Sequence, residues 1–74
     1  MKLRMFAVFD KAISAFNPPF CCRTDGEAKR SFANEVQNAQ GQIGKYRSDY
    51  SLYFIGVYDD TLGVVSADAP PYLS

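Results

Sequence analysis

Hydrophobic residues form two runs along the chain in which apolar side chains occupy both alternating sets of positions. The first run is Lys2 to Phe9 and the second is Ser51 to Tyr58. A strand with one face in water would alternate between apolar and polar residues, so both runs are typical of strands buried on two faces. We therefore expect the two runs side by side in the middle of a sheet, with both faces of the sheet covered.

Shorter patterns predict the partners of these strands. Asp59-Asp60-Thr61-Leu62-Gly63 places acidic turn residues and a glycine between the second run and Val64-Val65, which predicts a β-hairpin. Phe20 to Arg23 follows Pro18-Pro19, whose missing N–H groups are tolerated only at a sheet edge. This segment is expected to be a short edge strand, and Asp10 to Asn17 is expected to be a loop.

A helix is predicted from Asp25 to about Asn38. Thr24 can accept a hydrogen bond from the N–H of Glu27 at the helix start, and acidic residues suit the positive end of the helix dipole. The apolar stripe consists of Ala28, Phe32, Val36 and Ala39. Phe32 is expected to anchor the helix on the sheet, with a loss of about 3–5 kcal/mol on replacement by alanine. A loop is predicted from Gln40 to Asp49.

These elements predict an α+β fold in the order β-β-α-β-β. One helix would pack on a small antiparallel sheet of three to four strands, with residues 1–66 as a single domain and residues 67–74 as an extended tail containing two prolines. One helix covers only one face of such a sheet. The other apolar face predicts a homodimer through a sheet face or, alternatively, a cover made by the Asp10–Pro19 loop and the tail.

Length and composition exclude several classes of protein. A chain of 74 residues forms one small domain, which buries roughly 60% of the surface of its unfolded chain, and its apolar content is that of a folded protein. No apolar run approaches the roughly 20 residues of a membrane span, and the first residues lack a signal-peptide pattern. We expect a cytoplasmic protein with no membrane partner.

The residues needed for most catalytic and metal chemistry are missing. The chain has no histidine, and Cys21 and Cys22 are adjacent, so they neither staple the fold nor form a zinc site. Asp59-Asp60 could be imagined as a magnesium site, but aspartate is also favoured in tight turns. No nucleophile–base pair or phosphate-binding glycine loop is present. The protein is expected not to be an enzyme and to hold no cofactor or metal ion.

Charge is distributed unevenly although the formal net charge is zero. Residues 1–47 hold all eight basic side chains and four acidic ones, whereas residues 48–74 hold four acidic side chains and no basic one. Such an asymmetry can steer an anionic partner to one side of the molecule. It is equally compatible with a contact between copies of the chain or with a solvated surface.

Basic and aromatic residues occur together around Lys45-Tyr46-Arg47. Single-stranded nucleic acid is held by cations along its backbone and by rings on which bases stack, and this segment supplies both. The predicted nucleic-acid site consists of Lys29, Arg30, Lys45, Tyr46, Arg47 and Tyr50. The alternative interpretation is that both tyrosines belong to the core or its rim and that the helix lysine and arginine form a solvated face.

Several segments spread along nearly the whole chain form a recognisable set. They are Val8-Phe9-Asp10, Pro19-Phe20, Thr24-Asp25 with Phe32, Asp49-Tyr50-Ser51-Leu52-Tyr53, and Tyr58-Asp59-Asp60 with Gly63. Together they resemble the small nonstructural protein of gokushoviruses, single-stranded DNA bacteriophages of the Microviridae. The resemblance implies a protein made in the cytoplasm of the infected bacterium and absent from the mature virion. It also implies DNA binding, with single-stranded DNA as the expected partner, in viral DNA replication or in the switch to single-stranded synthesis and packaging.

The resemblance brings no catalytic residues with it. An alternative to DNA binding is an adaptor that recruits a viral initiator or a host replication protein through the exposed sheet face or the tail.

Overall fold

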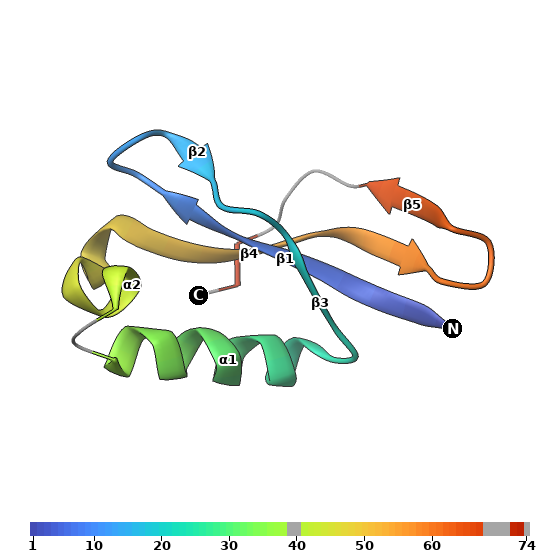
Figure 1. Cartoon of the computed structure of the whole chain (residues 1–74), viewed down its shortest axis with the longest axis horizontal. Coiled ribbons are helices and arrows are strands. Elements are labelled where there is room, and N and C mark those ends of the chain that lie inside the picture. The colour runs from blue at the N-terminus through green and yellow to red at the C-terminus, as the bar shows by residue number, and fades with distance from the viewer. Residues whose placement is uncertain (39–40, 68–71, 74) are drawn as a thin grey trace.

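The computed structural model, which describes residues 1–38, 41–67 and 72–73, places one long helix against a curled antiparallel sheet (Figure 1). Its elements are β1 (Lys2–Asp10), β2 (Ala15–Phe16), β3 (Phe20–Cys22), α1 (Asp25–Gln37), α2 (Gln42–Lys45), the 3₁₀ helix η1 (Arg47–Asp49), β4 (Tyr50–Asp59) and β5 (Val64–Ala67). The predicted α+β class is confirmed. The predicted β-β-α-β-β order is not, because β2 adds a strand where a loop was expected and α2 and η1 occupy most of the second predicted loop.

β1 lies at the centre of the sheet. It pairs with β4 along its whole length, from Lys2 opposite Asp59 to Asp10 opposite Tyr50. β2 and β3 pair in turn with the other edge of β1, and β5 pairs with the outer edge of β4. The two apolar runs are therefore neighbours in the middle of the sheet, as their pattern predicts.

A bulge interrupts the pairing of β1 with β4. Met5 lies opposite Gly56 and the next residue, Phe6, lies opposite Phe54, so Ile55 is an extra residue on β4. Because side chains alternate along a strand, the extra residue brings Phe54 and Val57 to the same face of the sheet. Bulges of this kind increase the local twist, which is consistent with the curl of the sheet.

The core lies between the sheet and α1. Its buried residues are Phe6, Val8, Cys22, Ala28, Tyr50 and Leu52, with Phe20, Phe32, Ile43, Phe54 and Leu73 packed against them. Phe6 and Leu52 have the largest fully buried side chains. The Phe6 ring lies 5.9 Å from the Phe20 ring and 5.8 Å from the Phe54 ring, measured between centroids. Aromatic packing on β1 therefore forms the centre of the core.

α1 begins as the sequence predicts. The Thr24 hydroxyl accepts a hydrogen bond of 3.1 Å from the N–H of Glu27. Asp25 forms an ion pair of 2.6 Å with Nε of Arg4, whose guanidinium also lies 4.1 Å above the Phe54 ring. The first turn of the helix is thus tied to β1 and β4. Among the described residues, no helix is long and apolar enough to span a bilayer.

The face of the sheet opposite α1 carries an aromatic cluster of Phe9, Phe16, Tyr53 and Tyr72. Ring centroids in this cluster lie 5.0 to 6.3 Å apart in edge-on pairs. Phe16 comes from β2, and Tyr72 forms an isolated bridge with Tyr53 on β4. These two side chains belong to the predicted loop and the predicted tail, and they cover this face only in part, because both remain exposed.

The predicted C-terminal tail does not stay clear of the domain where the structure describes it. Ala67, the first residue of the predicted tail, is the last residue of β5. The N–H of Leu73 donates a hydrogen bond of 2.8 Å to the carbonyl of Leu52, and its side chain packs on the core. Residues 68–71 and 74, on which the rest of that prediction falls, lie outside the described residues.

Candidate nucleic-acid interface

Lys45, Tyr46 and Arg47 lie together at one end of the molecule, between α2 and η1. All three are exposed, and the Lys45 Nζ lies 5.6 Å from the centroid of the Tyr46 ring. The position of α2 depends on Gly44, because a Cβ atom there would overlap the backbone of Asn38 at the end of α1. This close approach holds α2 against the end of α1, and the exposed Tyr46 ring follows Lys45 and precedes Arg47 in the sequence.

Tyr50 lies close in sequence but has a different environment. It is the first residue of β4, it is only 7% exposed, and it belongs to the core. Its ring is therefore not accessible for stacking with a base. This agrees with the alternative interpretation that Tyr50 is a core residue.

Lys29 and Arg30 lie apart from this segment. Both are exposed on α1, but they precede its last residue, Gln37, by eight and seven residues, which is about 10–12 Å along the helix axis. The structure therefore does not bring all six predicted residues into one cluster. It separates them into the Lys45–Arg47 segment, the two cations of α1, and the buried Tyr50.

A pocket opens beside Tyr46, and we refer to it as the η1 pocket. It has a volume of about 330 Å³ and is lined by Asp10, Ala12, Ile13, Tyr46, Asp49 and Tyr50. Two sequence segments meet here, because the N–H of Lys11 donates a hydrogen bond of 2.8 Å to the carbonyl of Asp49. The Asp10 carboxylate accepts a hydrogen bond of 3.0 Å from the N–H of Ala12. These two bonds fix the turn after β1 against η1.

The turn that forms one wall of the η1 pocket includes a residue in the left-handed region. Ser14 has a φ of 53° and is the only described residue other than glycine with a positive φ. Short polar side chains are more often found in this region than β-branched or bulky ones. The turn then lets Ala15 pair with Asp10 and leaves Ile13 66% exposed at the pocket.

Lys11, which the sequence pattern did not single out, is a third cation next in sequence to residues that line the η1 pocket, as Lys45 and Arg47 are. Lys11 lies between two pocket residues, Asp10 and Ala12, and is exposed. In the described part of the chain, ion pairs engage only the Met1 ammonium and Arg4. The three cations at this end are therefore not neutralised by ion pairs there. The turn after β1, which forms one wall of the η1 pocket, carries one sequence signal. That signal is Ile13, an apolar residue in a predicted loop that has no periodic pattern.

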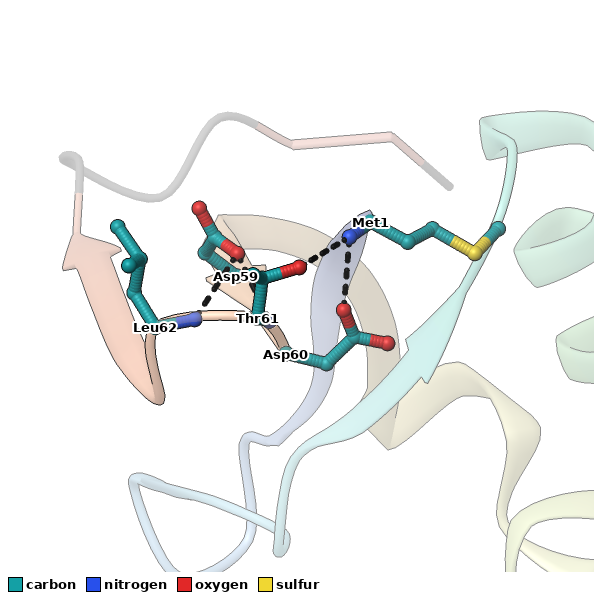
Figure 2. A network of polar contacts seen from close by, with 5 residues as sticks. All are labelled: Met1, Asp59, Asp60, Thr61 and Leu62. Atoms are coloured by element: carbon teal, nitrogen blue, oxygen red, sulfur yellow. Dashed lines mark hydrogen bonds and ion pairs between the residues drawn. The ribbon is translucent and has the colours of Figure 1, made fainter.

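The acidic turn between β4 and β5 lies at the opposite end of the molecule (Figure 1). Figure 2 shows that the Asp59 carboxylate accepts hydrogen bonds from the N–H groups of Thr61 and Leu62, at 3.0 and 3.3 Å. The Met1 ammonium contacts Asp60 at 2.8 Å and the Thr61 hydroxyl at 2.9 Å, and the bond to Asp60 raises the pKa of the Met1 amine. These contacts match the turn role predicted for Asp59-Asp60.

Potential metal ligands are dispersed in the part of the chain that the structure describes. No group of three or more histidine, cysteine, aspartate or glutamate side chains comes together there. Cys22 is buried while Cys21 is exposed, and neither forms a disulfide. Burial, followed by the nearby Glu27 carboxylate, raises the pKa of the Cys22 thiol, which makes it a weak nucleophile.

Comparison with known proteins matches the chain to a protein family. The family model of the phage ORF5 protein covers residues 3–73. No match was found among curated proteins or among solved structures. Because the matched region includes every helix and nearly every strand residue described above, the chain belongs to the phage ORF5 protein family, a family of bacteriophage proteins.

Proposed function

We propose that this nonstructural phage protein binds single-stranded DNA in the host cytoplasm. There it assists replication of the viral genome, or the switch to single-stranded synthesis and packaging. Membership of a phage protein family supports a role in a bacterium infected by a phage. The observation that carries the binding function is the Tyr46 ring, 46% exposed, with the Lys45 Nζ 5.6 Å from its centroid and the exposed Arg47 next in the sequence.

The chemistry of this segment fits a single strand. Cations attract the phosphate backbone, and an exposed ring provides a surface on which a base can stack, with about 1–3 kcal/mol lost per base when such a ring is removed. A base within a duplex is already stacked on both sides. Tyr46 therefore has a base face to contact only in an unpaired strand, and we expect single strands to bind more tightly than duplexes.

The number of cations sets the expected strength and salt dependence. Lys11, Lys45 and Arg47 are the cations nearest to the η1 pocket along the chain. Three phosphate contacts to a single strand give a slope of about −2 for the logarithm of the affinity against the logarithm of the salt concentration. We expect moderate affinity that falls steeply as salt is added.

A pair of double variants tests where the strand binds. K45A/R47A removes two cations beside Tyr46, and we expect weaker binding of a labelled single-stranded oligonucleotide and a flatter salt slope in fluorescence anisotropy. K29A/R30A removes the same charge from α1 and serves as the matched control, with a smaller expected effect. An unchanged affinity in K45A/R47A would show that this segment is not the site, as would an equal or larger loss in K29A/R30A.

A second candidate function is that of a protein–protein adaptor which recruits a viral initiator or a host replication protein. The feature that favours a protein contact is the sheet face opposite α1, where Leu3, Met5 and Phe9 lie opposite the uncharged residues Tyr58, Gly56 and Ser51. Leu3, Met5 and Phe9 are partly exposed, and Phe16 and Tyr72 on the same face are exposed. Contiguous apolar surface that is open to solvent marks protein interfaces. Direct binding of a purified viral initiator, together with no binding of single-stranded DNA at low salt, would favour the adaptor.

For the DNA-binding function we propose that this face pairs with a second copy of the chain, whereas in the adaptor it would contact the recruited protein. DNA would require cations that the paired residues of this face do not supply, whereas two uncharged faces can meet without like-charge repulsion. The aromatic cluster would then lie within a symmetric contact, and the cationic ends of two copies would remain accessible.

A further inference from the structure

We infer that the η1 pocket binds a single nucleobase and prefers a base with an exocyclic amino group, so that cytosine is favoured over thymine. This inference rests on the proposed function, because it requires a single strand to reach this end of the molecule. It adds to that function a base-reading site with a stated chemical preference.

The size of the η1 pocket suits one heterocycle. Its volume of about 330 Å³ lies at the lower end of the range of about 300–1,000 Å³ that is common for small-molecule sites. Two exposed side chains line it from different segments, Ile13 from the turn after β1 and Tyr46 from the position just before η1. An apolar group and an aromatic ring at the mouth of a pocket are suitable contacts for the flat faces of a base.

The polar groups of the pocket determine which base edge fits. Asp10 and Asp49 line it, and one oxygen of the nearly buried Asp10 already accepts the N–H of Ala12. In residues 1–38, 41–67 and 72–73, no hydrogen bond or ion pair engages the Asp49 carboxylate. An ionised carboxylate only accepts hydrogen bonds, so the base must donate. Cytosine offers its N4 amino group, whereas thymine presents the O4 acceptor at that position.

The arrangement of charge matches a nucleotide rather than a free phosphate. Carboxylates lie in the pocket, while Lys11, Lys45 and Arg47 are the exposed sequence neighbours of its lining residues. A phosphate in the pocket would meet like charges, but a base in the pocket would leave its phosphates beside the cations. The pocket therefore selects the base end of the nucleotide.

The test compares labelled oligo(dC) and oligo(dT) of equal length at neutral pH by fluorescence anisotropy. For the unmodified protein we expect oligo(dC) to bind about fivefold more tightly, at the low end of discrimination by hydrogen bonds to a base edge. In Asp49→Asn the side-chain amide can donate to thymine O4, so the ratio of the two affinities should fall to about one. The test depends on the ratio of the oligo(dC) affinity to the oligo(dT) affinity, because loss of a negative charge by itself raises both affinities and leaves their ratio unchanged.

Glu35→Gln is the matched control. It removes the same charge from an exposed residue near the end of α1 that does not line the η1 pocket, and the preference for oligo(dC) should persist. Thermal melts of both variants verify that the fold is kept. A preference that survives in Asp49→Asn, or equal binding of the two oligonucleotides by the unmodified protein, would overturn the inference and leave the proposed function standing. Binding of neither oligonucleotide at low salt would overturn both.

Discussion

At the scale of single residues, the two adjacent cysteines show how the position on a strand decides reactivity. Cys21 lies opposite Met5 on the exposed face, while Cys22 lies opposite Arg4 and belongs to the core. Burial raises the pKa of the Cys22 thiol, so the folded state favours its protonated form. The stability linked to this thiol is present below its ordinary pKa and is lost as the pH rises above it.

We therefore expect alkylation of the folded protein to label Cys21 first. Mass spectrometry of the protein after brief treatment with iodoacetamide at mildly alkaline pH should find the label on Cys21, with Cys22 modified only after denaturant is added. Equal labelling rates for the two thiols in the folded protein would contradict the assignment of Cys22 to the core.

Residue-scale features were predictable where the cause is local. The Thr24 cap and the Asp59 turn follow from side-chain chemistry within a few residues, and both are present. Tyr50 is different, because the burial of its side chain depends on where β4 begins. Once the strand starts at Tyr50 rather than Ser51, the two-residue period places its side chain on the same face as Leu52.

At the scale of elements, Phe32, the predicted anchor of α1, packs against the core but is only partly buried. The Phe6 side chain on β1 is fully buried. A cavity left by a fully buried ring has a larger effect on the free energy of unfolding than the loss of a partly exposed one.

We expect Phe6→Ala to lower the free energy of unfolding by about 3–5 kcal/mol. Phe32→Ala should have a smaller effect than that. Urea titrations followed by circular dichroism would measure both, and since Phe6→Ala can prevent folding altogether, Phe6→Leu supplies a milder comparison. A larger destabilisation by Phe32→Ala than by Phe6→Ala would place the centre of the core on the helix instead.

The long elements were predictable and the short ones were not. β1, β4 and α1 have strong periodic patterns or a capping signal, and their observed ends lie within one residue of the predicted ones. β2 has only two residues, and its Phe16 ring packs on the ring of Phe9, its pairing partner on the neighbouring strand β1. α2 contains Gly44 and depends on close approach to the end of α1. Such contacts are tertiary and leave no local pattern.

At the scale of the whole molecule, the two ends and the two sheet faces have different characters. α2 lies at one end of the molecule and the β4–β5 turn at the other (Figure 1). The η1 pocket is lined by Tyr46, the residue that follows α2. The candidate interface could be predicted only in part from the sequence. Lys45, Tyr46 and Arg47 are contiguous, but Asp10, Ala12 and Ile13 line the pocket beside Tyr46 from a segment more than thirty residues earlier.

The proposed dimer belongs to this scale. We expect the purified protein to behave as a dimer in size-exclusion chromatography with light scattering, and we expect Phe16→Glu to shift it to a monomer. Phe16 is exposed on the face opposite α1, so the added charge disfavours pairing of two such faces without opening the core. Leu62→Glu is the control, because it adds the same charge at an exposed position in the distant β4–β5 turn. A monomeric unmodified protein, or a dimer unchanged by Phe16→Glu, would rule out this interface.

The central claim is that the protein itself binds single-stranded DNA at its cationic end. The most direct measurement is an anisotropy titration of the unmodified protein with a labelled single strand and with the matching duplex, at a low and at a moderate salt concentration. The account predicts saturable binding that is tighter for the single strand and falls with salt at a logarithmic slope of about −2. No binding of the single strand at low salt, or binding of the duplex at least as tight, would contradict it.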